Sequence, residues 1–298
     1  MGISDQKSTA EPAKNSAPQA AAKRPNERKF LLVAGVWLTA FAALWPTALA
    51  LAGLWQHEAF QHGYLIPLIS LYFLWQRRER VSQLNITPDF RGLPILTGAL
   101  AIWLVARLAT VEVIEHISLL LVTLSLVWVL LGWRVFAATA LPNGFLIFAI
   151  PIGMELIPLL MDVSAGVATE ILRILGYSIY RDGFLLYLPQ GTFEVAEACS
   201  GFNFLFSGIA MSVAIICTSS RSSPTRVIFV VLSALVFVAL NWLRIVIVIA
   251  MIIWSDMTMF LGSDHEFIGW IIFAVVLGLQ LFVAGRISDR EALRTPGT

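Results

Sequence analysis

The run Val227-Ile-Phe-Val-Val-Leu-Ser-Ala-Leu-Val-Phe-Val-Ala-Leu-Asn-Trp-Leu-Arg-Ile-Val-Ile-Val-Ile-Ala-Met-Ile-Ile-Trp254 decides the fold. Its single charged residue is Arg244. An α-helix rises 1.5 Å per residue, so about 20 apolar residues cross the roughly 30 Å of hydrocarbon in a bilayer. This run is longer than that, and it predicts a membrane-spanning helix.

The rest of the chain has the same character. Of its 298 residues, 58% are hydrophobic and 13% are charged, and the mean hydropathy is +0.81. This composition excludes a water-soluble globular domain. We therefore expect an all-α integral membrane protein with about eight transmembrane helices, a number uncertain by one or two because the second apolar run is short and prolines interrupt the fifth. The expected spans lie near residues 30–54, 64–76, 93–110, 117–133, 135–159, 200–218, 227–254 and 266–284.

The positions of the basic residues predict the orientation. Cytoplasmic loops next to spans are enriched in lysine and arginine, and a model with both termini inside places most of the 20 basic residues there. We expect three regions: a disordered cytoplasmic tail over 1–28, a membrane domain over 29–286 and a second cytoplasmic tail over 287–298. The first apolar run is too long for the apolar region of a signal peptide, so it predicts an uncleaved anchor.

Two segments between the spans predict structure of their own on the extracytoplasmic side. Apolar residues recur with helical period from Met161 to Tyr180, which indicates an amphipathic helix on the membrane surface. Two short strand-like runs follow, on either side of Pro189-Gln-Gly191, and they predict a hairpin. The hairpin would deliver Cys199 to the outer end of the sixth span.

Cys199 is the candidate nucleophile. Cysteine attacks as the thiolate, which a neighbouring cation or a helix N-terminus stabilises. We expect Cys199 to lie directly before the N-terminus of the sixth span, where the N–H groups of Ser200 and Gly201 could hold an oxyanion. A disulfide with Cys217 is excluded, because a helix would separate the two by roughly 27 Å, whereas a disulfide needs Cα atoms within about 7 Å.

Two further reactive residues are predicted at the same membrane depth. Arg244 lies in the outer third of its span, where a charge usually faces a polar cavity and a partner, and Asn241 shares its helix face. His265 begins the last span and could transfer protons near neutral pH. Each residue also has a structural interpretation: a packed cysteine, a snorkelling arginine or an interfacial histidine. Their agreement in depth favours a common site.

Weaker candidates surround this site. Glu197 shares strand parity with Cys199, and His62 in the first outer loop could line the same opening, although a simple polar loop explains it equally well. Glu115 and His116 lack the ligand spacing of a zinc site, so we expect neither metal nor cofactor. A net charge of +1 with no basic recognition surface gives no reason to expect a nucleic-acid partner.

At these residues the chain resembles the exosortase and archaeosortase family of membrane-embedded cysteine transpeptidases. Four elements carry the resemblance, in order and spacing: Gln61-His-Gly-Tyr-Leu-Ile-Pro67, Glu197-Ala-Cys-Ser-Gly201, Asn241-Trp-Leu-Arg244, and Asp264-His265 with Gly269-Trp270. The segments Gly191-Thr-Phe-Glu-Val-Ala196 and Gly262-Ser-Asp-His265 are similar to the exosortase A type, which is associated with exopolysaccharide production.

The resemblance implies a site that opens outward from the bacterial inner membrane, facing the periplasm or cell exterior. Cys199 would be the nucleophile, Arg244 a stabiliser of substrate or oxyanion, and His265 the proton-transfer residue. Implied substrates are membrane-anchored proteins ending in a Pro-Glu-Pro motif, a transmembrane helix and a basic tail. Residues expected to contact them are Glu197, Ser200, Gly201, Asn241 and His62. The alternative from another class is a multi-span transporter or a non-catalytic component of envelope polysaccharide assembly.

Overall fold

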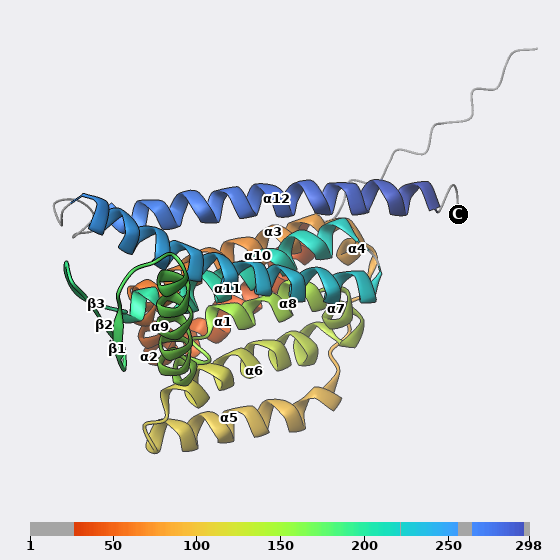
Figure 1. Ribbon diagram of the computed structural model, residues 1–298. Coiled ribbons are helices and arrows are strands. Elements are labelled where there is room, and N and C mark those ends of the chain that lie inside the picture. Colours follow the sequence, from red (N-terminus) through yellow and green to blue (C-terminus); the bar gives the residue numbers. More distant parts are fainter. Residues whose placement is uncertain (1–26, 221, 256–263, 295–298) are drawn as a thin grey trace, which may run out of the picture.

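The chain folds into a bundle of helices with a small sheet at one end (Figure 1). The structure is a computed structural model that describes residues 27–220, 222–255 and 264–294. The predicted tail over 1–28 therefore lies almost wholly outside the described residues. The α-helices are α1 (Glu27–Ala43), α2 (Trp45–Leu54), α3 (Leu65–Gln76), α4 (Arg78–Gln83), α5 (Leu93–Leu108), α6 (Glu112–Leu131), α7 (Trp133–Ala138), α8 (Ala140–Phe145), α9 (Ile157–Ile174), α10 (Phe202–Ser219), α11 (Ser223–Trp254) and α12 (Asp264–Arg294).

Short elements connect these helices. The strands are β1 (Tyr180–Asp182), β2 (Leu185–Leu188) and β3 (Gly191–Glu194). The 3-10 helices are η1 (Glu58–Tyr64), η2 (Phe90–Gly92), η3 (Leu146–Ala149), η4 (Met154–Leu156) and η5 (Glu197–Cys199). The last of these helices carries the candidate nucleophile, between the sheet and α10.

The all-α integral membrane class is confirmed, but the number of eight spans is not. Among the described residues, five helices are long and apolar enough to cross a membrane, and two bent helix pairs raise the number to at most seven. The predicted span over 64–76 corresponds to α3, which has 12 residues. That length gives a rise of only about 18 Å, less than the hydrocarbon thickness.

Two predicted spans are bent rather than straight. The run 30–54 divides into α1 and α2, which meet at 94°, with Pro46 in the first turn of α2. The second bend, of 52°, separates residues 140–149 from 154–174. Pro151 lies within that break, and Gly153, whose φ of +95° favours glycine, directly precedes η4.

The helix predicted over Met161–Tyr180 is confirmed in part, because α9 runs from Ile157 to Ile174, and its position on the membrane surface stays a prediction. Gly176 has φ +91°, its N–H donates to the Arg173 carbonyl, and the Tyr177 N–H donates to the Leu172 carbonyl. This pair of bonds is the Schellman motif, in which a left-handed glycine caps the helix C-terminus. The chain then turns into the sheet.

The predicted hairpin is confirmed and has a third strand. The sheet is antiparallel in the order β1-β2-β3, and Leu188 pairs with Gly191 across the predicted turn. Leu186 is fully buried and packs in one hydrophobic cluster with residues of α9 and α11, including Leu172 and Ile249. The sheet is therefore fixed to α9 and α11.

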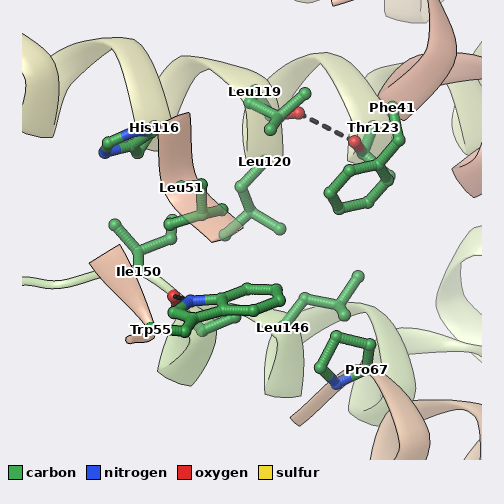
Figure 2. Close-up of a pocket in the computed structure, with 11 residues that line it drawn as sticks. Phe41, Leu51, Trp55, Pro67, His116, Leu119, Leu120, Thr123, Leu146 and Ile150 are labelled. Carbon is green, nitrogen blue, oxygen red and sulfur yellow. Dashed lines mark hydrogen bonds between the residues drawn. The ribbon is translucent and has the colours of Figure 1, made fainter. Parts of the chain in front are cut away.

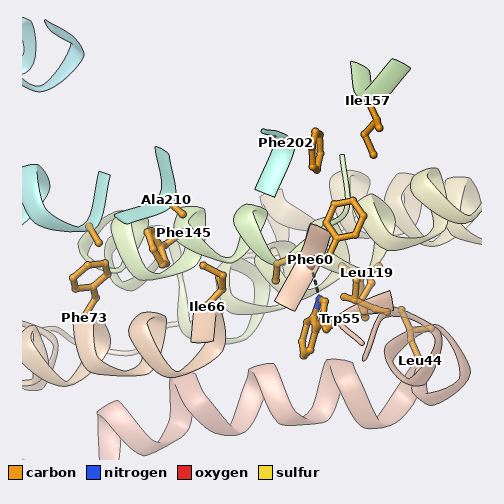
Figure 3. Packing of buried hydrophobic residues seen from close by; sticks show 14 of the residues in the cluster. Leu44, Trp55, Phe60, Ile66, Phe73, Leu119, Phe145, Ile157, Phe202 and Ala210 are labelled. Atoms are coloured by element: carbon orange, nitrogen blue, oxygen red, sulfur yellow. Dashed lines mark hydrogen bonds between the residues drawn. The ribbon is translucent and has the colours of Figure 1, made fainter. Parts of the chain in front are cut away.

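An aromatic cluster places the start of α10 against the earlier helices. Phe202, the first residue of α10, lies edge-on to Phe60 of η1 with ring centroids 5.5 Å apart (Figure 3). Phe73 of α3 meets Phe145 of α8 in the same manner, at 5.3 Å. These rings belong to one buried core cluster that joins both halves of the chain.

Helices α10 and α11 approach each other closely at Gly208 and Phe237. A Cβ atom at Gly208 would lie 2.2 Å from the Phe237 ring, so the ring of α11 occupies the space that a side chain on α10 would need. Figure 1 shows α10, α11 and α12 running side by side, with the sheet and α9 at one end. The candidate site lies at that end.

Candidate active site

Cys199 lies in a tight turn between the sheet and α10. Its N–H donates to the Ala196 carbonyl at 2.8 Å, and the Ser200 N–H donates to the Glu197 carbonyl at 3.0 Å. Gly201 follows with φ +83°, and α10 begins at Phe202. The prediction that Cys199 directly precedes the helix is therefore wrong by two residues, since Ser200 and Gly201 intervene. The half-buried thiol lies at the end of η5.

Arg244 of α11 reaches the thiol. Its Nη2 atom lies 3.7 Å from Cys199 Sγ, across 45 positions of sequence. The arginine is only 5% exposed, and its Cζ atom lies 5.1 Å from the ring centroid of Phe204 in α10. A guanidinium held between sulfur and an aromatic face stabilises negative charge on that sulfur. The predicted approach of Arg244 to Cys199 is thus present.

Asn241 holds the backbone of Cys199, the candidate nucleophile. Its Nδ2 atom donates to the Cys199 carbonyl oxygen at 3.0 Å. Gly201 leaves the room for this amide, because a Cβ atom there would lie 2.6 Å from Asn241 Nδ2. Asn241 is 1% exposed, so it lies beneath the turn rather than at an open surface. The prediction that Asn241 shares a face with Arg244 is confirmed, but its contact is with Cys199.

Ser200 also points inward. It is buried, and its Oγ atom accepts the N–H of Phe202 at 3.2 Å. Its carbonyl oxygen accepts a hydrogen bond from Ser164 Oγ of α9 at 3.3 Å. The Ser200 N–H is bonded to Glu197, which removes it as the predicted oxyanion donor. Gly201 is buried as well, and its N–H has no acceptor among the described residues.

His265 belongs to the first turn of α12, but its side chain lies outside the described part of the structure. Gly269, four residues later, is on the same helical face. A Cβ atom at Gly269 would lie 3.4 Å from Arg244 Nη1 and 3.0 Å from the Phe204 ring. Helix α12 therefore passes directly against Arg244. That His265 completes the site stays a prediction.

The two remaining sequence candidates, Glu197 and His62, differ in burial. Glu197 is exposed in η5, beside the thiol in sequence. His62 is half-buried in η1, which packs on the start of α10 through Phe60 and Phe202. Burial lowers the pKa of His62 to about 4, against a raising effect from a backbone hydrogen bond with Phe148. Its imidazole is thus neutral at physiological pH, and its Nδ1 atom has no hydrogen-bond partner among the described residues.

Glu115, at the start of α6, belongs to a structural hydrogen-bond network, whereas the neighbouring His116 does not. Arg107 Nη1 donates to Glu115 Oε1 at 3.0 Å, Thr47 Oγ1 donates to the same oxygen, and Trp103 Nε1 donates to Thr47 Oγ1 at 2.9 Å. His116 lines an apolar cavity of about 20 Å³ between α2 and α6 (Figure 2). Within the described ranges, no three His, Cys, Asp or Glu side chains gather as metal ligands.

Two residues of the site were not predicted from sequence. Ser164 is a polar residue on the buried stripe of α9, in helical register with Met161 and Ala168, and that register was a usable signal. Phe204 carries no such signal. Its role depends on how α10 meets α11, which sequence periodicity does not specify.

Fold and site together define a helical, multi-span membrane protein with a cysteine–arginine pair at one end of its bundle. The sequence model of the transmembrane exosortase family (Exosortase_EpsH) matches residues 54–282. This match covers more than half of the chain, and the chain belongs to the transmembrane exosortase family. No curated protein and no solved structure matches the chain.

Proposed function

We propose that this chain is a membrane-embedded cysteine protease or transpeptidase that cleaves sorting signals near the C-terminus of exported proteins. The observation that supports this most directly is the 3.7 Å approach of Arg244 Nη2 to Cys199 Sγ. Family membership agrees with it, since exosortases are membrane transpeptidases. A transporter would need a polar pathway and no nucleophile, and the half-buried thiol at a helix terminus favours the enzyme.

The proposed reaction proceeds in two steps. In the first, Sγ attacks the carbonyl carbon of the scissile peptide, and Arg244 stabilises the negative charge that develops on the carbonyl oxygen. His265 takes the thiol proton and gives it to the leaving amine as the C–N bond breaks. A thioester joins the sorted protein to Cys199, and the membrane anchor departs.

The second step releases the product. Water, an amine or a sugar hydroxyl attacks the thioester carbonyl, the C–S bond breaks, and the sulfur leaves as a thiolate that regains the proton of the nucleophile. Water gives hydrolysis with a free carboxylate. An amine or hydroxyl gives transfer to an acceptor. The mass of the new C-terminus of a processed substrate distinguishes these outcomes.

The substrate assignment rests on the resemblance to the exosortase A type. We propose substrates with a Pro-Glu-Pro motif, a transmembrane helix and a basic tail, in a system linked to exopolysaccharide or biofilm matrix. The exposed Glu197 would meet the substrate first. The site would face the periplasm, because Arg77, Arg78 and Arg226 lie near α4 and the start of α11, at the end of the bundle opposite the sheet (Figure 1).

The chain offers a matched pair of variants for the test. Cys199→Ala removes the proposed nucleophile, and Cys217→Ala removes the other cysteine, near the far end of α10. We expect Cys199→Ala to accumulate full-length, anchored substrate in membranes, whereas Cys217→Ala processes it normally. Normal processing by Cys199→Ala would overturn the enzyme assignment.

A further inference from the structure

Two buried side chains hold consecutive carbonyl oxygens of the nucleophile turn. Asn241 Nδ2 of α11 donates to the Cys199 carbonyl at 3.0 Å. Ser164 Oγ of α9 donates to the Ser200 carbonyl at 3.3 Å. Each side chain is 1% exposed. The turn is therefore fixed from below by two helices that approach it from different directions.

This arrangement constrains the amide groups of the turn. The C=O and N–H of a trans peptide point in opposite directions, so holding the Ser200 carbonyl toward Ser164 directs the Gly201 N–H away from α9. That N–H has no acceptor among the described residues. Holding the Cys199 carbonyl on Asn241 fixes the backbone from which Sγ projects toward Arg244.

The hydrogen bonds that the Asn241 side chain makes and lacks indicate that it does more than fill space. Its Oδ1 atom is buried and has no hydrogen-bond partner among the described residues. A buried polar atom without a partner is unfavourable, and an apolar residue of similar size would avoid it. Asparagine is needed here for its Nδ2 donor. Gly201 lacks the Cβ atom that would otherwise displace this amide.

We infer that Asn241 and Ser164 are positioning residues that act through the Cys199–Ser200 turn, a pair we term the carbonyl clamp. Neither side chain is open to a substrate, so neither is a catalytic residue. The clamp holds Sγ against Arg244 and fixes the direction of the buried Gly201 N–H. This inference rests on the proposed cysteine chemistry. It changes the predicted role of Asn241 from substrate contact to control of the nucleophile.

The test measures the thiol itself. In a Cys217→Ser background Cys199 is the single cysteine, and its alkylation by iodoacetamide at neutral pH reports how the sulfur is held, without any substrate. We expect Asn241→Ala and Ser164→Ala to slow alkylation several-fold per folded molecule. Processing of a Pro-Glu-Pro substrate should fall more, by about 100-fold for Asn241→Ala, the loss typical of a misplaced reacting group.

Thr169→Val on α9 is the matched control. Thr169 is buried like Ser164, but its hydroxyl donates to the Ala165 carbonyl of its own helix at 2.7 Å. We expect this variant to match the parent in both alkylation and processing. A second positioning test uses Asn241→Asp, which keeps the shape and removes the donor. It should lose as much alkylation as Asn241→Ala.

Alkylation and processing within twofold of the parent for folded Asn241→Ala and Asn241→Asp would overturn the carbonyl clamp. Equal losses in Thr169→Val would also overturn it, because they would indicate general destabilisation of the bundle. The proposed function fails separately, if Cys199→Ala still processes substrate. Alkylation of Cys199 needs no substrate, so the two failures are distinguishable.

Discussion

Arg244 Nη2 lies 3.7 Å from Cys199 Sγ, although α10 and most of α11 separate the two residues in sequence. Both belong to one end of the bundle because α10 runs away from that end and α11 returns to it. The antiparallel pair thereby places a cation from the last third of α11 beside a thiol that precedes α10. A charge within a membrane span needs a favourable partner. Arg244 has two, the sulfur of Cys199 and the ring of Phe204.

The geometry of Arg244 predicts a difference between two substitutions. Arg244→Lys keeps the charge but replaces a planar group that contacts both sulfur and an aromatic face. We expect it to lose about tenfold or more in processing rate, and Arg244→Gln to lose about 100-fold or more. Single-turnover formation of the thioester measures both. Equal rates for the parent and the lysine variant would contradict the planar role and leave only a charge effect.

His265 is predicted to move protons, and this separates it from Arg244. We expect His265→Gln to reduce the processing rate by about 100-fold or more, the usual contribution of a general acid–base group. Alkylation of Cys199 should stay closer to that of the parent than in Arg244→Gln, because Arg244 still faces the sulfur. The neighbouring substitution Glu266→Gln serves as the control, since adjacent helical residues do not share a face.

Sequence patterns predicted the parts of the fold that are encoded locally. The long apolar run of α11, the hairpin at Pro189-Gln-Gly191 and the candidate Cys199 each follow from composition or spacing within one segment. The bend between α1 and α2 was missed, since an apolar run reads the same whether straight or bent at 94°. The length of α9 was overestimated because Gly176 ends the helix inside an apolar pattern.

Sequence reasoning named Cys199 and Arg244 as candidate site residues, but it named neither Ser164 nor Phe204 and did not give the contacts of Asn241. Cys199 and Arg244 stand out because a reactive thiol and an intramembrane charge are uncommon in such a chain. The bonds from Asn241 and Ser164 to the turn depend on how three helices pack, and no spacing rule specifies that. Sequence reasoning therefore assigned Asn241 to the substrate, whereas in the structure its amide donates to the Cys199 carbonyl.

The network at Glu115 predicts a stability effect without a catalytic one. Glu115→Gln keeps the volume but weakens the bonds from Thr47 and Arg107. We expect the free energy of unfolding to fall by about 1–2 kcal/mol, a modest value because the Arg107 side chain is 47% exposed. Thermal unfolding in detergent measures this loss. The processing rate per folded molecule should stay at the parent value, and a large drop would connect this network to the site.

His62 predicts how stability depends on pH. Burial lowers its pKa from 6.5 to about 4, so the unfolded chain binds this proton more readily than the folded one. Stability from this group is complete above pH 6.5, falls as the pH drops, and is fully lost below about pH 4. The loss amounts to roughly 3 kcal/mol, from about 1.4 kcal/mol for each unit of the pKa difference.

The test is the free energy of unfolding measured against pH. His62→Gln should flatten this pH dependence across the window, whereas His57→Gln, at an exposed position, should not. Parallel curves for His62→Gln and the parent would contradict the burial of a neutral imidazole between α2 and α3.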